Sequence, residues 1–133
     1  MVHGGRPSYP TRRSSDLAKF HDGDAELAPG LSIHKIGGHS AGLMCVRVRT
    51  ERGWVVLASD CAHFYENIRE RKPFVICYDL GSMMTGFNTM ELLADSPDHI
   101  VPGHDPLVMD YYPAPSPDLE GAVVRLAVMP KTG

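Results

Sequence analysis

The sequence predicts a single α+β domain, and three observations lead to this prediction. Short segments in which apolar and polar residues alternate predict β-strands, and two segments near the middle of the chain predict short helices. The chain has 133 residues, which is enough for one hydrophobic core, and its hydrophobic fraction of 43% is typical of a folded globular protein.

The first strands are predicted by their alternation and by the turn signals around them. Residues 31–36 alternate after the turn signal of Pro29 and Gly30, as a half-buried strand does. Residues 44–49 alternate as well, and the apolar run 54–58 follows after a few polar residues. We therefore expect a β-hairpin in which residues 50–53 form a four-residue connection.

Two helices and a further strand are expected in the middle of the chain. Residues 64–71 predict one short helix, and residues 88–94 predict another. Asn88 is the expected N-cap of the second helix, since Glu91 follows at the spacing of a capping box. Residues 99–102 predict a short strand.

The two ends of the chain differ in character. Residues 1–17 show neither helical nor strand periodicity, and we expect a disordered or artefactual leader there, with the folded domain at residues 18–133. Near the other end, residues 112–117 are rich in proline and predict an extended linker. Residues 121–129 alternate and predict a last strand.

Composition narrows the classes of partner and the cellular location. The net charge of −3 comes from scattered acids and bases without a basic block, so no nucleic acid partner is expected. No apolar stretch is long enough to span a membrane. Cys45, Cys61 and Cys77 lie among apolar neighbours and predict buried free thiols in a reducing compartment. The sequence therefore predicts a cytoplasmic protein without a membrane partner.

Three polar residues each follow a short apolar run, namely His39, Asp60 and His104. Imidazole nitrogens and carboxylate oxygens are the ligands that zinc and similar divalent ions prefer. A rigid scaffold aims such groups at one point from the loops at its strand ends. Each residue alone is also typical of an ordinary turn, so the prediction of a metallohydrolase site rests on the three positions together.

The loop that contains His39 also matches the sequence motif of a second class of enzyme. Residues 38–42, GHSAG, fit the nucleophile elbow of serine hydrolases, with Ser40 as the nucleophile. Asp60 or Asp79 and then His104 follow in the order that a catalytic triad of that kind requires. An elbow must lead into a helix, however, and residues 43–49 alternate as a strand does. A serine hydrolase is therefore kept only as an alternative.

The sequence resembles the metallo-β-lactamase superfamily, and within it the N-acyl homoserine lactonase-like branch. The resemblance runs from about Asp22 to the C-terminus. It rests on four motifs: GGHSAG at 37–42, ASDCAHFYEN at 58–67, VPGHDP at 101–106 and YPAPSPDLEG at 112–121.

The resemblance implies the C-terminal half of an αββα sandwich, in which helices flank a mixed β-sheet. It also implies a site for two divalent metal ions, expected to be zinc. In this site His39 matches a ligand of the first metal, Asp60 the carboxylate that bridges both, and His104 a ligand of the second. Such a pair of ions generates hydroxide near neutral pH and polarises the carbonyl group that it attacks. The implied function is a metal-dependent hydrolase that opens a small-molecule lactone or ester, as in quorum quenching.

The resemblance leaves the catalytic side chain open. Lactonases of this kind use a tyrosine shortly after the bridging aspartate to assist the substrate. Here His63 stands three residues after Asp60, whereas Tyr65 stands five residues after it. We expect Tyr65 to take this role, with His63 as the other candidate. Both positions are equally compatible with simple packing at the start of a helix.

One signature of the family, His-x-His-x-Asp-His, does not occur in these 133 residues. Without it each metal keeps one histidine and the shared Asp60, against the three protein ligands of a usual catalytic zinc site. We therefore expect weak metal binding and impaired or absent activity in this chain alone. An inactive fragment or a binding module with a vestigial metal pocket is the alternative. Half of a sandwich also exposes an apolar sheet face, which predicts self-association.

Overall fold

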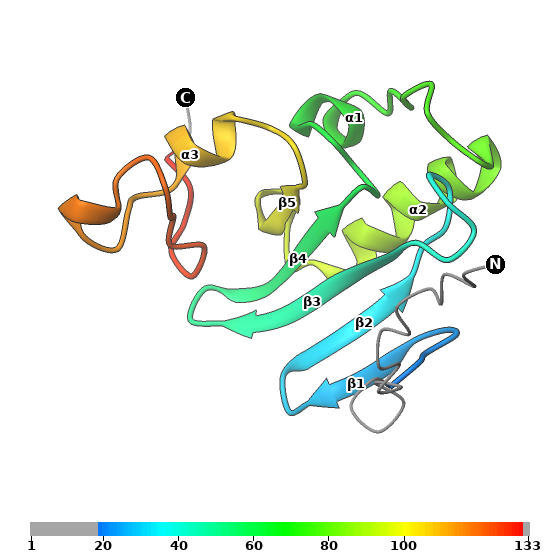
Figure 1. Cartoon of the computed structure of the whole chain (residues 1–133), viewed down its shortest axis with the longest axis horizontal. Helices are drawn as coiled ribbons and strands as arrows, with labels where there is room; N and C mark the ends of the chain where they lie inside the picture. Colours follow the sequence, from blue (N-terminus) through cyan, green and yellow to red (C-terminus); the bar gives the residue numbers. More distant parts are fainter. Residues whose placement is uncertain (1–18, 132–133) are drawn as a thin grey trace, which may run out of the picture.

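The structure is a computed structural model that describes residues 19–131. Its centre is a five-stranded sheet in the order β1-β2-β3-β4-β5. The strands are β1 (Ala25–Ala28), β2 (Leu31–Lys35), β3 (Met44–Thr50), β4 (Gly53–Ser59) and β5 (Ile100–Pro102). The first four pair antiparallel, and β5 pairs parallel to β4. The predicted α+β class with a mixed sheet is therefore confirmed, while the predicted leader at residues 1–17 lies outside the described residues (Figure 1).

The hairpin of β3 and β4 is present with a shorter connection than the sequence predicts. Thr50 pairs with Gly53 in the ladder, so only Glu51 and Arg52 form the turn. The Thr50 hydroxyl also donates a hydrogen bond to the Gly53 carbonyl at 2.8 Å. The expected four-residue connection is wrong because its outer residues belong to the strands. Strand β1 was not predicted, and it pairs along β2 at the edge of the sheet.

The helices are α1 (Tyr65–Arg69), α2 (Leu80–Leu93) and α3 (Leu107–Tyr111). Helix α1 agrees with the prediction, but the predicted second helix starts too late. Asp79 is the N-cap of α2, and its carboxylate accepts a hydrogen bond from the N–H of Ser82. Asn88 lies inside α2 instead, where its exposed side chain accepts a hydrogen bond from Arg71.

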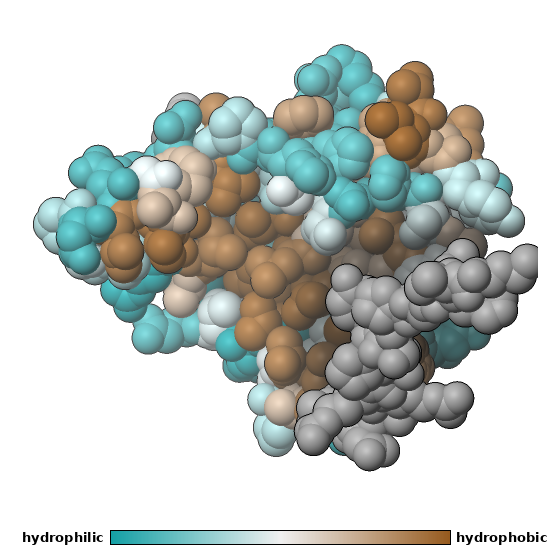
Figure 2. Space-filling view, in the orientation of Figure 1, coloured by the Kyte–Doolittle hydropathy of each residue, from teal (hydrophilic) through white to brown (hydrophobic). Residues whose placement is uncertain are grey.

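Two hydrophobic clusters lie on the two faces of the sheet. On one face, α1 and α2 pack against the strands through the buried residues Cys45, Val56, Ala58, Cys61, Ala62, Ile68, Met83, Phe87, Met90 and Ile100. On the other face, Val55 and Val101 pack with Tyr112 and with partly buried residues of the C-terminal segment. Figure 2 shows hydrophobic side chains at the surface over the sheet, so this second face is only partly covered.

The last predicted strand, at residues 121–129, is not a strand in the structure. The segment runs through turns, and it is anchored by hydrogen bonds from Arg125 N–H to Pro113 O at 2.9 Å and from Lys131 N–H to Tyr111 O at 2.8 Å. The apolar side chains of the segment pack on the sheet face. The alternation of apolar and polar residues therefore reflects the burial of one side of the segment, although its backbone does not pair with a strand. No helix among residues 19–131 is long and apolar enough to cross a membrane.

Candidate metal centre

The candidate metal ligands lie together because of the strand directions. Strands β2, β4 and β5 run the same way, so their C-terminal ends meet at one edge of the sheet. His39 lies in the loop after β2, Asp60 directly follows β4, and His104 follows β5. The prediction that these three residues converge from strand ends thus agrees with the geometry, and His63 joins them from the loop after Asp60.

Backbone contacts hold the two central loops against each other. The N–H of Gly103 donates to the carbonyl of Ala62, and the N–H of His104 donates to the carbonyl of His63, both at 2.9 Å. Ser59, just before Asp60, has a φ of 49°, in the left-handed region that non-glycine residues rarely adopt. Such backbone strain concentrates where surrounding structure fixes a functional side chain. These contacts set the direction in which Asp60 leaves the sheet.

The carboxylate of Asp60 lies between the histidines. Its Oδ1 accepts a hydrogen bond from Nε2 of His104 at 2.6 Å and lies 3.6 Å from Nε2 of His63. Its Oδ2 lies 3.9 Å from Nε2 of His39. One carboxylate oxygen therefore faces His39, and the other faces His63 and His104.

Neighbouring groups orient two of the imidazole rings. Nδ1 of His39 donates to the carbonyl of Ile76 at 2.7 Å, which requires the proton on Nδ1 and leaves Nε2 as the free donor atom of the neutral ring. A backbone carbonyl on the far nitrogen is the usual support for a metal-binding histidine. The ring of His63 stacks on Phe74, with centroids 3.8 Å apart and planes at 16°.

The charges in the cluster suit metal binding. The hydrogen bond from His104 lowers the pKa of Asp60, and the nearby histidine charges lower it further. Burial lowers the pKa of His63, and the charge of His104 acts in the same direction against the opposing effect of Asp60. Ionised carboxylate and neutral imidazole are the forms that bind metal ions. The donor set therefore fits a divalent ion, and the ligand atoms of Asp60, His63 and His104 all lie within 4.8 Å of one another.

Tyr65 lies in a different environment from the cluster. Its ring is buried against Tyr111, with centroids 5.3 Å apart, and the Arg69 guanidinium lies 4.7 Å from its centroid. Its hydroxyl has no hydrogen-bond partner within residues 19–131, and burial raises the pKa of that hydroxyl. Of the two candidates for the catalytic role, His63 is the one that the structure brings to Asp60. The roles of both residues remain predictions.

Other residues support the site without having been predicted. Asp105 accepts a hydrogen bond from the N–H of Tyr65 at 2.9 Å through Oδ2 and one from Leu107 at 3.0 Å through Oδ1. It thereby ties the residues after His104 to the start of α1. The position of Asp105 directly after His104, in the GHDP segment, was the sequence feature that could have indicated its role. Phe74 and Ile76 had no such signal, because they reach the histidines from a distant loop.

The serine hydrolase alternative lacks its structural context. Ser40 is exposed in the loop between β2 and β3, and the segment that follows is β3. A nucleophile elbow requires a helix at that point to support the oxyanion hole.

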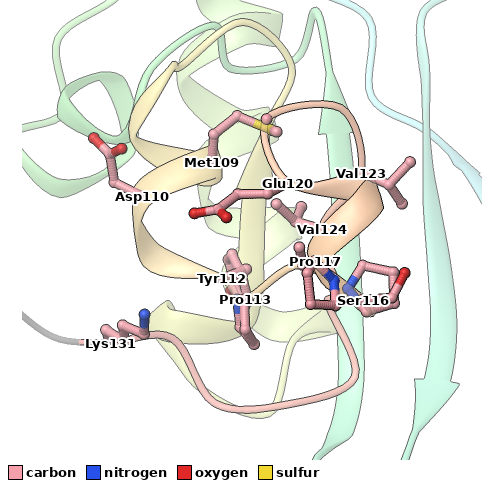
Figure 3. Close-up of a pocket in the computed structure, with 13 residues that line it drawn as sticks. Met109, Asp110, Tyr112, Pro113, Ser116, Pro117, Glu120, Val123, Val124 and Lys131 are labelled. Carbon is pink, nitrogen blue, oxygen red and sulfur yellow. The ribbon is translucent and has the colours of Figure 1, made fainter.

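A separate cavity lies away from this cluster. It has a volume of about 550 Å³ and is lined by residues of α3 and the C-terminal segment, among them Met109, Tyr112 and Val124 (Figure 3). No residue of the His and Asp cluster lines it. The chemically competent groups converge at the sheet edge, and we therefore assign the candidate site there.

Comparisons with known proteins agree with this placement. No protein-family model and no curated protein sequence matches the chain. Among solved structures, a quorum-quenching N-acyl homoserine lactone lactonase superposes with a TM-score of 0.59 and 29% identity over 66% of this chain. An N-acyl homoserine lactone hydrolase with the product N-hexanoyl-L-homoserine bound at its catalytic metal centre superposes with a TM-score of 0.62 and 28% identity over 69% of this chain.

A mutant of the B. thuringiensis AiiA protein, with N-decanoyl-L-homoserine bound at its active site, also gives a TM-score of 0.62 at 28% identity over 69% of this chain. The chain spans 37% of the length of each of these structures. The resemblance predicted from the sequence is confirmed: over the part that it covers, this chain has the metallo-β-lactamase fold of the N-acyl homoserine lactonases.

Proposed function

We propose that this chain carries a metal centre for the hydrolysis of lactone or ester bonds. The observation that carries the proposal is the Asp60 carboxylate, which presents Oδ2 to His39 and Oδ1 to His104. A carboxylate between two imidazoles in this way suits a bridge between two ions. The lactone substrate class is supported by the structural neighbour that binds N-hexanoyl-L-homoserine at its catalytic metal centre.

In this proposal His39 and Asp60 would hold one ion, and Asp60 and His104 would hold the other. Bound ions at such a site act as Lewis acids on a carbonyl oxygen and lower the pKa of a water molecule. The imidazole and carboxylate donors are compatible with zinc, which is our expected metal. Asp60 and its histidines keep the donor atoms oriented, and Tyr65 and His63 remain the two candidates for assisting the substrate.

We also propose that turnover by this polypeptide is low. The His-x-His-x-Asp-His signature is not in its sequence, so each of the two ions has few protein ligands. The half-covered sheet face supports self-association, and the three free cysteines support the predicted cytoplasmic location.

The test is a lactone-opening assay on the whole chain after loading with zinc. We expect slow hydrolysis of an N-acyl homoserine lactone that stops when a chelator removes the metal and in the variant His104→Ala. His21→Ala is the matched control, because His21 is an exposed histidine of the segment before β1. Zinc-loaded chain that shows no lactone or ester hydrolysis above the His104→Ala background would contradict the proposed function.

A further inference from the structure

We propose that His63 is a metal ligand, and that Asp60, His63 and His104 together hold one divalent transition-metal ion in a three-ligand site. The proposal rests on the proposed function only in placing a metal at this sheet edge. It assigns to His63 a role different from assistance to the substrate, and it predicts one firmly bound ion per chain.

The donor distances carry the first step. In a tetrahedral zinc site with bonds of about 2.1 Å, neighbouring donor atoms lie roughly 3.4 Å apart. Nε2 of His63 lies 3.6 Å from Oδ1 of Asp60, which is close to this value. Nε2 of His104 is hydrogen-bonded to the same oxygen at 2.6 Å, so it must move outward by less than 1 Å to admit an ion. The ligand atoms of all three residues lie within 4.8 Å of one another, so the three donors already surround a common point.

The fixed position of His63 is the second step. Its ring stacks on Phe74, and only 18% of its side chain is exposed, so Nε2 is held towards Asp60. Its carbonyl accepts the N–H of His104, so the backbones of the two histidines are tied together. A ligand that is already oriented loses little conformational freedom when it binds a metal.

The third step is the difference between the two sides of Asp60. The Oδ1 side has two histidines, with ring centroids of His63 and His104 4.8 Å apart. The Oδ2 side has His39 at 3.9 Å, and it lacks a second imidazole among the described contacts of that oxygen. A catalytic zinc site usually has three protein ligands, which the Oδ1 side supplies and the Oδ2 side does not. The Oδ1 side should therefore fill first, and the Oδ2 side should bind a second ion far more weakly.

The same geometry leaves room for chemistry at the ion. Two histidines and one carboxylate leave coordination positions open for water or substrate, as in catalytic zinc and non-haem iron sites. The side chain of His104 is 59% exposed, so the cluster is open to solvent on that side.

The competing explanation is that His63 only packs on Phe74 and balances the charge of Asp60. Metal titration separates the two. The metal-free chain is titrated with Zn²⁺ against a chromophoric chelator, and the bound metal is counted by elemental analysis. We expect one tight ion per chain, an affinity at least tenfold lower in His63→Gln and in His104→Gln, and a smaller loss in His39→Gln. His21→Gln is the matched control and should bind as the unchanged chain does.

The visible absorption of bound Co²⁺ gives a second measurement, which His63→Gln would leave unchanged if His63 only packed on Phe74. A four-coordinate Co²⁺ site has an intense visible absorption, and we expect it to weaken strongly in His63→Gln while circular dichroism shows an intact fold. An unchanged zinc affinity and Co²⁺ spectrum in His63→Gln would overturn the proposal, and so would two equally tight ions per chain. One tight ion without lactone hydrolysis would instead leave the His63 assignment intact and contradict the proposed function.

Discussion

Gly103 lies directly against the carbonyl of Ser59, and this contact aligns the ends of β4 and β5. A Cβ atom on Gly103 would lie 2.5 Å from the Ser59 oxygen and 2.7 Å from its carbonyl carbon. These are backbone atoms, so they cannot move aside without shifting the strand end. Asp60 and His104 are the residues that immediately follow, and the contact thus sets the separation of two candidate ligands.

We predict that Gly103→Ala both destabilises the fold and weakens metal binding. Overpacking of this kind costs about 1–3 kcal/mol, which urea denaturation of the metal-free chain measures. Gly42→Ala is the matched control, because a Cβ on Gly42 meets nothing within 4 Å. The control should change the stability by less than about 0.5 kcal/mol. Equal stabilities and zinc affinities for the two variants would show that the contact between Gly103 and Ser59 does not position the site.

A second prediction concerns the two glycines of α2. Gly86 faces the loop before His39, and a Cβ there would clash with Cγ2 of Ile36. Because Ile36 is β-branched and stiff, Gly86→Ala should lower the free energy of unfolding by about 1 kcal/mol despite the higher helix propensity of alanine. Gly81 has only an ordinary contact with Asp79, and Gly81→Ala should raise stability by about 0.5 kcal/mol.

In urea denaturation we expect Gly86→Ala to lower the free energy of unfolding and Gly81→Ala to raise it. A gain in stability from both variants would mean that α2 and the loop of Ile36 are packed more loosely than the structure has them.

The strands were predictable from the sequence where each one both alternates and pairs. The predicted strands at 31–36 and 44–49 satisfy both conditions and correspond to β2 (Leu31–Lys35) and β3 (Met44–Thr50). The C-terminal segment satisfies only the first, since its apolar side chains cover a sheet face while its backbone bonds to nearby loops. Alternation reports which side of a segment is buried, and the presence of a neighbouring strand is a property of the whole fold.

The start of α2 was missed for a local reason. Leu80 is exposed, and glycines at 81 and 86 interrupt the apolar pattern. The buried residues Met83, Gly86, Phe87 and Met90 form a helical face, but a glycine in that face carries no apolar signal. The cap at Asp79, which accepts from Ser82, was the usable indication.

The candidate site was predictable in its strand-end residues but not in its geometry. His39, Asp60 and His104 each follow a strand, and parallel strand directions bring such ends together. The position of His63 depends on Phe74, which arrives from the segment between α1 and α2. Nothing in the sequence spacing of these two residues indicates that their rings stack.

A third prediction concerns the partly covered face of the sheet. Val46 pairs with Leu57 on the face opposite the helices, and it is only half-buried. If copies of the chain associate through this face, Val46→Thr should weaken association, because it removes apolar surface and keeps the side-chain shape and strand propensity. Sedimentation velocity over a range of concentrations measures the change. Val75→Thr is the matched control, since Val75 is 96% exposed in the segment between α1 and α2.

Association that weakens with Val75→Thr and not with Val46→Thr would place the contact on that segment instead of the sheet.

The last prediction uses the cysteines, which differ in their access to reagents. Cys45 and Cys61 are buried, whereas Cys77 is partly exposed. Burial raises the pKa of Cys45 to about 12 and raises that of Cys61 as well. Because the thiolate is the reactive form, a thiol reagent at pH 8 should label Cys77 first, and the other two only as the chain unfolds. Cys77→Ala should remove the fast phase and leave the slow one.

The same burial makes stability depend on pH in a defined direction. Above the ordinary thiol pKa of 9.0, the unfolded chain loses protons that the folded chain keeps on Cys45 and Cys61. The free energy of unfolding should therefore fall as the pH rises from 9 towards the raised pKa of about 12. Cys45→Ala should reduce the slope of this fall in urea denaturation. Fast labelling of all three thiols at pH 8, or a slope that Cys45→Ala leaves unchanged, would show that the packing of Cys45 and Cys61 beneath α2 is looser than the structure indicates.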